Sequence, residues 1–104
     1  MNKYHAKKTT IDGITFDSKK EADRYCKLKL LQRAGMISDL RLQVPFELLQ
    51  KQKGERAIKY IADFVYIENG ETIVEDVKGM KTDVYKIKRK LFKHLYPQYI
   101  FRET

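Results

Sequence analysis

The chain has 104 residues, of which 42% are hydrophobic and 35% charged, a composition typical of one globular domain and not of a disordered chain. Its formal net charge of +8 favours a polyanionic partner, with nucleic acid first, over a neutral small molecule. No apolar run reaches the roughly 18 residues of a membrane span, no apolar signal core opens the chain, and the single cysteine, Cys26, excludes an internal disulfide. We therefore expect a cytoplasmic protein with no membrane partner.

Residues 1–17 form a basic N-terminal segment that contains Lys3, His5, Lys7 and Lys8. Within it, Asp12-Gly13 lies between β-forming residues and predicts a short type I′ hairpin. The next segment predicts a helix over Ser18–Ala34. Ser18 and Glu21 fit a capping box at its start, and Gly35 is suited to the position after its end.

Three strand-like segments follow the helix. Asp39–Leu49 alternates apolar and polar residues, and Pro45 within it favours an edge position in the sheet. Ala57–Glu68 and Glu71–Lys78 are joined by Asn69-Gly70, a strong signal for a two-residue hairpin turn.

A second helix is predicted from Thr82, a suitable N-cap, to the region before Pro97. Its apolar stripe is expected to comprise Val84, Ile87, Leu91 and Leu95. Gln98–Glu103 is a short terminal strand. The order α-β-β-β-α-β over a single domain, residues 1–104, predicts an α/β (α+β) fold in which helices flank a mixed four-stranded sheet.

The Asn69-Gly70 turn fixes the register of its hairpin. Val65 faces Val74, and Asp63 faces Asp76. Since side chains alternate along a strand, Asp63, Asp76 and Lys78 are expected on one face of the sheet. The other face is expected to carry Glu75 together with Tyr60, Phe64, Tyr66, Ile73 and Val77.

The opposed carboxylates need a cation. Directly opposed residues have Cβ atoms about 4.5–5.5 Å apart, and like charges at that distance destabilise a sheet. Lys78 is one candidate, in an ion-pair cluster that holds the register, but it neutralises only one of the two charges. A divalent metal bound by carboxylate oxygens is the other candidate, and we favour it.

These residues carry a resemblance to a known superfamily. An acidic residue on a first helix (Glu21), Asp on one strand (Asp63) and (Asp/Glu)-x-Lys on the next (Asp76-Val77-Lys78) resemble the PD-(D/E)XK nucleases. The predicted order of elements is also that superfamily's restriction-endonuclease-like core, and the resemblance spans about residues 18–102. Ala62 stands where the motif has Pro, and Asp76 replaces the more frequent Glu, which shortens the ligand by one methylene.

A closer similarity is to small phage-encoded members of the superfamily. It rests on Phe16-Asp17-Ser18-Lys19-Lys20-Glu21-Ala22, Tyr60-Ile61-Ala62-Asp63-Phe64 and Val74-Glu75-Asp76-Val77-Lys78-Gly79. Archaeal Holliday-junction resolvases and the endonuclease subunit of some transposition systems share the arrangement more distantly. The resemblance implies a phage-encoded endonuclease that acts in DNA recombination.

The resemblance also implies a mechanism. Asp63 and Asp76 would hold one or two Mg²⁺ (or Mn²⁺) ions, helped by the Val77 carbonyl and by Glu21, and Lys78 would orient or deprotonate the attacking water or stabilise the transition state. From the sequence alone, Glu21 is explained equally well as the capping-box residue.

Further basic residues on the second helix could contact DNA phosphates: Lys86, Lys88, Arg89, Lys90 and Lys93. A solvated helical face explains most of them almost as well. Lys88 lies within the apolar stripe and would come level with Asp76 if the helix folds back over the sheet. A lysine that extends past the edge of the stripe into solvent explains it equally well. Tyr85 is expected to pack in the core.

We therefore expect a Mg²⁺-dependent DNA endonuclease, with branched DNA a possible substrate. The main alternative is a non-catalytic nucleic-acid-binding module that kept the fold, and a third is a small protein that acts on a protein partner. Linear duplex, single strands and RNA are also compatible with these residues. A homodimer is expected, since cleavage of two strands needs two active centres related by symmetry.

Overall fold

The computed structural model describes residues 7–104, so the part of the predicted basic segment that holds Lys3 and His5 lies outside the described residues. Its elements run β1 (Thr9–Ile11), β2 (Ile14–Phe16), α1 (Lys19–Arg33), β3 (Ser38–Leu49), β4 (Ile58–Glu68), β5 (Glu71–Asp76), α2 (Asp83–Leu95) and β6 (Ile100–Glu103). The predicted fold class is confirmed: β3-β4-β5-β6 form a mixed four-stranded sheet, to which β1-β2 add a separate hairpin. Between residues 7 and 104, no helix is both long and apolar enough to cross a membrane.

The predicted turns and caps are present. Asp12-Gly13 and Asn69-Gly70 both have positive φ at each residue, as a type I′ turn requires. At the start of α1 the Ser18 hydroxyl accepts from the Glu21 N–H at 3.1 Å, and Thr82 caps α2 in the same way. Both helices therefore begin where their sequences predict.

The sheet places β3 at one edge, as Pro45 predicted, and β6 at the other, parallel to β5. The β4–β5 register is confirmed from Glu68–Glu71 through Val65–Val74 to Phe64–Glu75. The strand predicted to reach Lys78 ends at Asp76, and the backbone of Asp76 and Lys78 hydrogen-bonds to Thr104 at the end of the chain. Lys78 thus lies just beyond the end of β5, two residues after Asp76.

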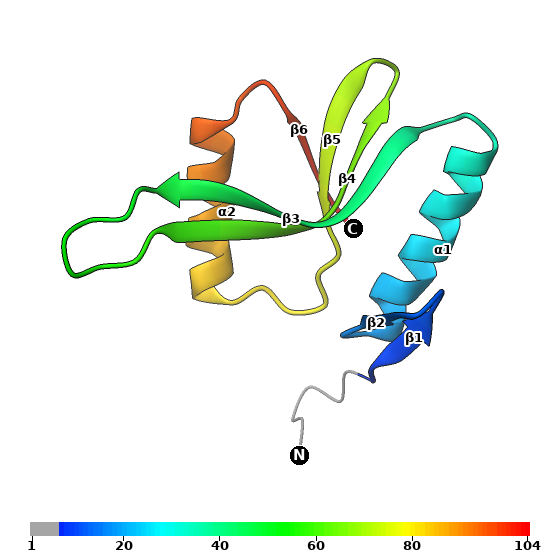
Figure 1. The fold of residues 1–104 in the computed structure, drawn as a ribbon, viewed down its shortest axis with the longest axis horizontal. Coiled ribbons are helices and arrows are strands. Elements are labelled where there is room, and N and C mark those ends of the chain that lie inside the picture. Colours follow the sequence, from blue (N-terminus) through cyan, green and yellow to red (C-terminus); the bar gives the residue numbers. More distant parts are fainter. Residues whose placement is uncertain (1–6) are drawn as a thin grey trace.

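The sheet is bent, so each helix covers a different part of it (Figure 1). In the picture the β3–β4 ribbon turns sharply near its middle, with the part next to the β3–β4 turn over α2 and the rest toward α1. Each helix has its own hydrophobic cluster. One joins residues of α1 and its hairpin to Phe64, Tyr66 and Ile73; the other joins Tyr85 and Phe92 of α2 to Tyr60, Val65 and Val74.

The bend interrupts the alternation of side chains. Leu42 packs in the α1 cluster and Val44 in the α2 cluster, although residues two apart on a regular strand share a face. Gln43 between them has φ 52°, a left-handed conformation that is rare for a residue other than glycine. On β4, Phe64 and Ala62 are divided in the same way. The functional residues lie at this bend.

Two predictions about faces are wrong for this reason. Tyr60 packs with Val65 and Val74 and not with Phe64 and Tyr66, because it lies beyond the bend. The expected apolar stripe of α2 is also not the buried face. Its members Val84, Ile87, Leu91 and Leu95 are 38–63% exposed, while Tyr85 and Phe92 are buried against a group of aromatic side chains that includes Phe46 and Tyr60.

Candidate active site

Three acidic side chains meet at the bend of the sheet. Glu21 comes from the first turn of α1, Asp63 from the middle of β4 and Asp76 from the last position of β5. Glu21 and Asp76 are only 7% and 1% exposed, and Asp63 is half-buried. The structure therefore brings together the three acidic residues predicted from the sequence, and we call them the carboxylate row, with Asp63 in the middle.

Asp63 is held by the neighbouring backbone and by one amide side chain. The Val77 N–H donates to Asp63 Oδ2 at 2.8 Å, and Gln43 Nε2 lies 3.4 Å from Asp63 Oδ1. The contact from Val77 explains why the β4–β5 ladder ends, because this N–H bonds a carboxylate and not the β4 backbone. The predicted role of the Val77 carbonyl as a metal ligand stays a prediction.

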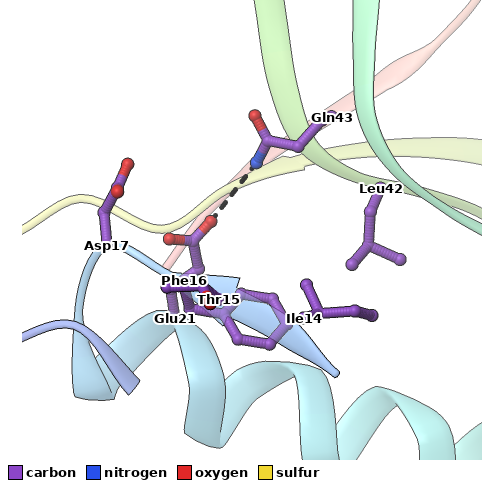
Figure 2. A pocket seen from close by; sticks show the side chains of 7 residues that line it. All are labelled: Ile14, Thr15, Phe16, Asp17, Glu21, Leu42 and Gln43. Atoms are coloured by element: carbon purple, nitrogen blue, oxygen red, sulfur yellow. Dashed lines mark hydrogen bonds between the residues drawn. The ribbon is translucent and has the colours of Figure 1, made fainter. Parts of the chain in front are cut away.

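Gln43 also connects Asp63 to Glu21. Its Nε2 lies 3.4 Å from Glu21 Oε2, and Figure 2 shows the amide pointing down from β3 onto the Glu21 carboxylate. A single amide group thus lies between two carboxylates, held there by a residue whose backbone is itself strained. Gln43 could not be identified from the sequence, because the residues around it have the pattern of an ordinary strand. Its positive φ is visible only in the structure.

A cavity of about 430 Å³ opens beside the Glu21 end of the row. It lies between the β1–β2 hairpin and the bent part of β3, with Ile14 and Leu42 on one side and Asp17 on the other (Figure 2). Glu21 and Gln43 form part of its wall, so the cavity borders the Glu21 end of the carboxylate row.

Asp76 is the most unusual group of the row. Both of its carboxylate oxygens are buried, and within residues 7–104 neither has a hydrogen-bond partner. The Tyr60 hydroxyl lies beside them without forming a hydrogen bond of normal geometry, and Lys78 Nζ is 3.5 Å from Asp76 Oδ2. A buried carboxylate with no donor is costly, so this position is one that a cation would stabilise.

The proton affinities reflect this crowding. Burial raises the pKa of Glu21 to about 7, together with repulsion from Asp63 and a hydrogen bond that the protonated Glu21 carboxyl donates to Asp63. Burial and the same neighbour raise the pKa of Asp76 to about 7, although Lys78 acts in the opposite direction. Two carboxyl groups that hold protons near neutrality are a common sign of a site at which a cation binds or a proton moves.

Lys78 has three neighbours that hold it in place. Its Nζ pairs with Asp76 and lies over the Tyr85 ring, 4.7 Å from the centroid. Its backbone carbonyl accepts from Lys20 Nζ at 3.2 Å. Tyr85 in turn donates its hydroxyl hydrogen to Glu103, which also pairs with Arg89 at 2.9 Å. Tyr85 packs in the core as predicted, and it also positions the candidate catalytic lysine.

Glu75, the neighbour of Asp76, faces the other side of the sheet as predicted. It is fully buried and receives hydrogen bonds from Arg24, at 2.5 and 2.9 Å, from Tyr66 and from Thr104. Both of its oxygens therefore accept hydrogen bonds, whereas those of Asp76 accept none within residues 7–104. This ion-pair network joins α1 to the centre of the sheet and has no free oxygen to offer a ligand.

The predicted phosphate-contacting residues of α2 fall into different environments. Lys86 and Lys90 are exposed, and Lys93 extends over the Phe101 ring. Arg89 is engaged by Glu103 and is therefore not a free cation. Lys88 is half-buried and lines the same hollow as Lys78.

Comparison with known proteins places the chain in a family but gives it no activity. A family model described as protein of unknown function (DUF1064) matches residues 1–103, which include the whole carboxylate row. No curated protein and no solved structure matches the chain. A function for the chain therefore has to be inferred from the residues of its own site.

Proposed function

This chain belongs to the DUF1064 family, whose description names no activity, and we propose from its site that it is a metal-dependent endonuclease that hydrolyses phosphodiester bonds in DNA. The observation that carries the proposal is Asp76, a buried carboxylate with no hydrogen-bond donor among residues 7–104, next to Asp63 and 3.5 Å from Lys78. An acidic pair with an adjacent lysine, on a protein of net charge +8, suits a reaction at a phosphate group.

The residues fit a hard divalent cation such as Mg²⁺ or Mn²⁺. Between residues 7 and 104 there is no cluster of three or more His, Cys, Asp or Glu side chains that encloses one ion. A closed site of that kind is not needed, because Mg²⁺ is commonly bound by one or two carboxylates and completes its shell with water and substrate oxygens. Asp76 and Asp63 would hold the ion, with Glu21 at the far end of the row and the Val77 carbonyl as a further oxygen.

A bound divalent ion supplies an activated water and neutralises charge on the scissile phosphate. The chain itself does the positioning. Lys78 keeps an ammonium group beside Asp76, where it can donate to a phosphate oxygen or orient the attacking water. Tyr85 and Lys20 fix that lysine, and the Val77 N–H fixes Asp63. With Asp76 buried, the reacting groups are shielded from bulk water on the sheet side.

The same residues are compatible with a non-catalytic nucleic-acid-binding module, favoured by the net charge and by the open arrangement of the acids. Such a module has no use for a buried carboxylate that accepts no hydrogen bond within residues 7–104, because this group lowers stability and repels phosphate. We therefore place the nuclease first.

A cleavage panel tests the proposal. Linear duplex, flap, four-way junction, single-stranded DNA and RNA should be incubated with the protein in Mg²⁺, in Mn²⁺ and in chelator. We expect cleavage of at least one DNA in the presence of metal, none in chelator, and loss of cleavage with retained binding for Asp76→Asn. Binding without cleavage in every condition would favour the non-catalytic module, and equal cleavage in chelator would exclude the metal mechanism.

A further inference from the structure

A second concave surface adjoins the carboxylate row on the α2 side. This hollow has a volume of about 270 Å³. It is formed by β4, by the segment after β5 and by the first turns of α2, and its lining residues are Lys59, Tyr60, Ile61, Lys78, Thr82, Val84, Tyr85 and Lys88. Lys78 belongs both to this lysine hollow and to the ion pair with Asp76, so the hollow begins where the carboxylate row ends.

The charges around the lysine hollow are all positive. Three of its lining residues are lysines, and none is acidic. Of these, only Lys78 forms an ion pair within residues 7–104. Glu47 stands opposite Lys59 on β3, yet the two side chains are not in ion-pair contact. Lys59 and Lys88 are thus two cations, from different elements, that line one concave surface and form no ion pair within residues 7–104.

The lining of the lysine hollow is also partly apolar. Ile61 and Val84 belong to it and are 54% and 63% exposed. Cations and apolar side chains on one surface match a phosphate carrying a sugar, because the sugar carbons can pack on the aliphatic groups. A second copy of the chain fits less well, since two proteins of net charge +8 would bring their lysines together.

We infer that the lysine hollow binds the phosphate next to the scissile one, through Lys59 and Lys88, with its deoxyribose against Ile61 and Val84. The inference rests on the proposed function, because it takes the substrate to be a polynucleotide whose scissile phosphate lies at the carboxylate row. It also answers an electrostatic problem of that function. Three carboxylates repel a phosphate backbone, and cations are needed directly beside them to hold the strand.

The test measures binding without divalent metal, so that it does not depend on cleavage. The dinucleotide pTpT is titrated into the ¹⁵N-labelled protein, and the backbone amides of Ile61 and Val84 report on the hollow. We expect both to shift in the wild type and to stay unchanged in Lys59→Gln/Lys88→Gln. The control is Lys27→Gln, an exposed lysine of α1, which should behave as the wild type. Thermal melts of each variant establish that it is folded.

A 20-base-pair duplex gives a second measurement. The double variant should bind about tenfold more weakly, the scale of one charged hydrogen-bonded contact. The slope of log affinity against log salt should fall by about 1, as for one lost phosphate contact. The inference would be overturned if pTpT shifted the Ile61 and Val84 amides of the double variant as much as those of the wild type, or if the wild-type shifts were confined to other surfaces.

The two proposals can fail separately. Lysine-dependent pTpT binding in a protein that cleaves nothing would keep the phosphate site and remove the nuclease. Metal-dependent cleavage by a protein whose pTpT shifts do not depend on Lys59 and Lys88 would keep the nuclease and remove the phosphate site.

Discussion

Replacing Asp76 with Asn should make the metal-free protein more stable, by an amount that grows with pH. Asp76 is 1% exposed, its oxygens have no hydrogen-bond donor in the described part of the chain, and its pKa is raised to about 7. An unfolded Asp titrates near pH 4. Between these values the folded state binds more protons than the unfolded state, so the stability of the wild type falls as pH rises through this window and levels off above it. Asn does not titrate and escapes this loss.

The size of the effect follows from the shift. Three pH units at about 1.4 kcal/mol each give an upper bound of roughly 4 kcal/mol. Real protein interiors relax around a buried charge, so we expect about 2 kcal/mol in favour of Asp76→Asn at pH 8. For a domain of this size that is roughly 10 °C in melting temperature.

Thermal melts of both proteins in chelator from pH 4 to pH 8 measure the difference. Saturating Mg²⁺ at pH 8 should then stabilise the wild type but not the variant, because an ion that binds only the folded state shifts the equilibrium toward it. A variant that is less stable than the wild type at pH 8, or a difference that does not change with pH, would refute the reasoning.

Three further predictions concern other residues of the fold. Glu75→Gln should lower the free energy of unfolding in urea by about 3 kcal/mol, because Arg24 loses its buried partner. A gain in stability would show that Glu75, like Asp76, is a destabilising buried acid. Gln43→Gly should be more stable than Gln43→Ala by about 1 kcal/mol in the free energy of unfolding by urea, since only glycine adopts φ 52° without strain. Equal stability of the two variants would argue against a strained bend. Ile87→Glu, on the exposed side of α2, should change stability by less than about 0.5 kcal/mol, whereas Phe92→Ala should cost about 3–5 kcal/mol; the reverse order would restore the apolar stripe as the buried face.

The parts of the fold that local chemistry determines could be predicted from the sequence. The two type I′ turns need positive φ at both positions, and Asp12-Gly13 and Asn69-Gly70 provide it. The register of the β4–β5 hairpin then follows as far as Phe64–Glu75, and Asp63 and Asp76 lie next to each other just beyond this pair. The placement of Glu21 beside them came from the resemblance, since the capping pattern alone explained that residue equally well.

The parts that depend on distant packing could not be predicted in the same way. The second helix has two apolar sides, Val84–Ile87–Leu91–Leu95 and Tyr85–Phe92, and its own periodicity does not choose between them. The choice is made by Phe46 and Tyr60, which the bend at Gln43 turns toward the helix. The same bend brings Lys59 into the lysine hollow, a position that no local pattern indicates.

The measurement that tests the central claim most directly is calorimetric titration of Mn²⁺ into the purified protein at pH 8. Asp76→Asn and Asp63→Asn are the site variants. Asp23→Asn is the matched control, since Asp23 is an exposed acid of α1 that pairs with Lys19 at 2.8 Å. The account predicts saturable binding by the wild type and by Asp23→Asn, and loss of that binding in both site variants. No binding by the wild type, or the same binding by Asp76→Asn, would contradict it.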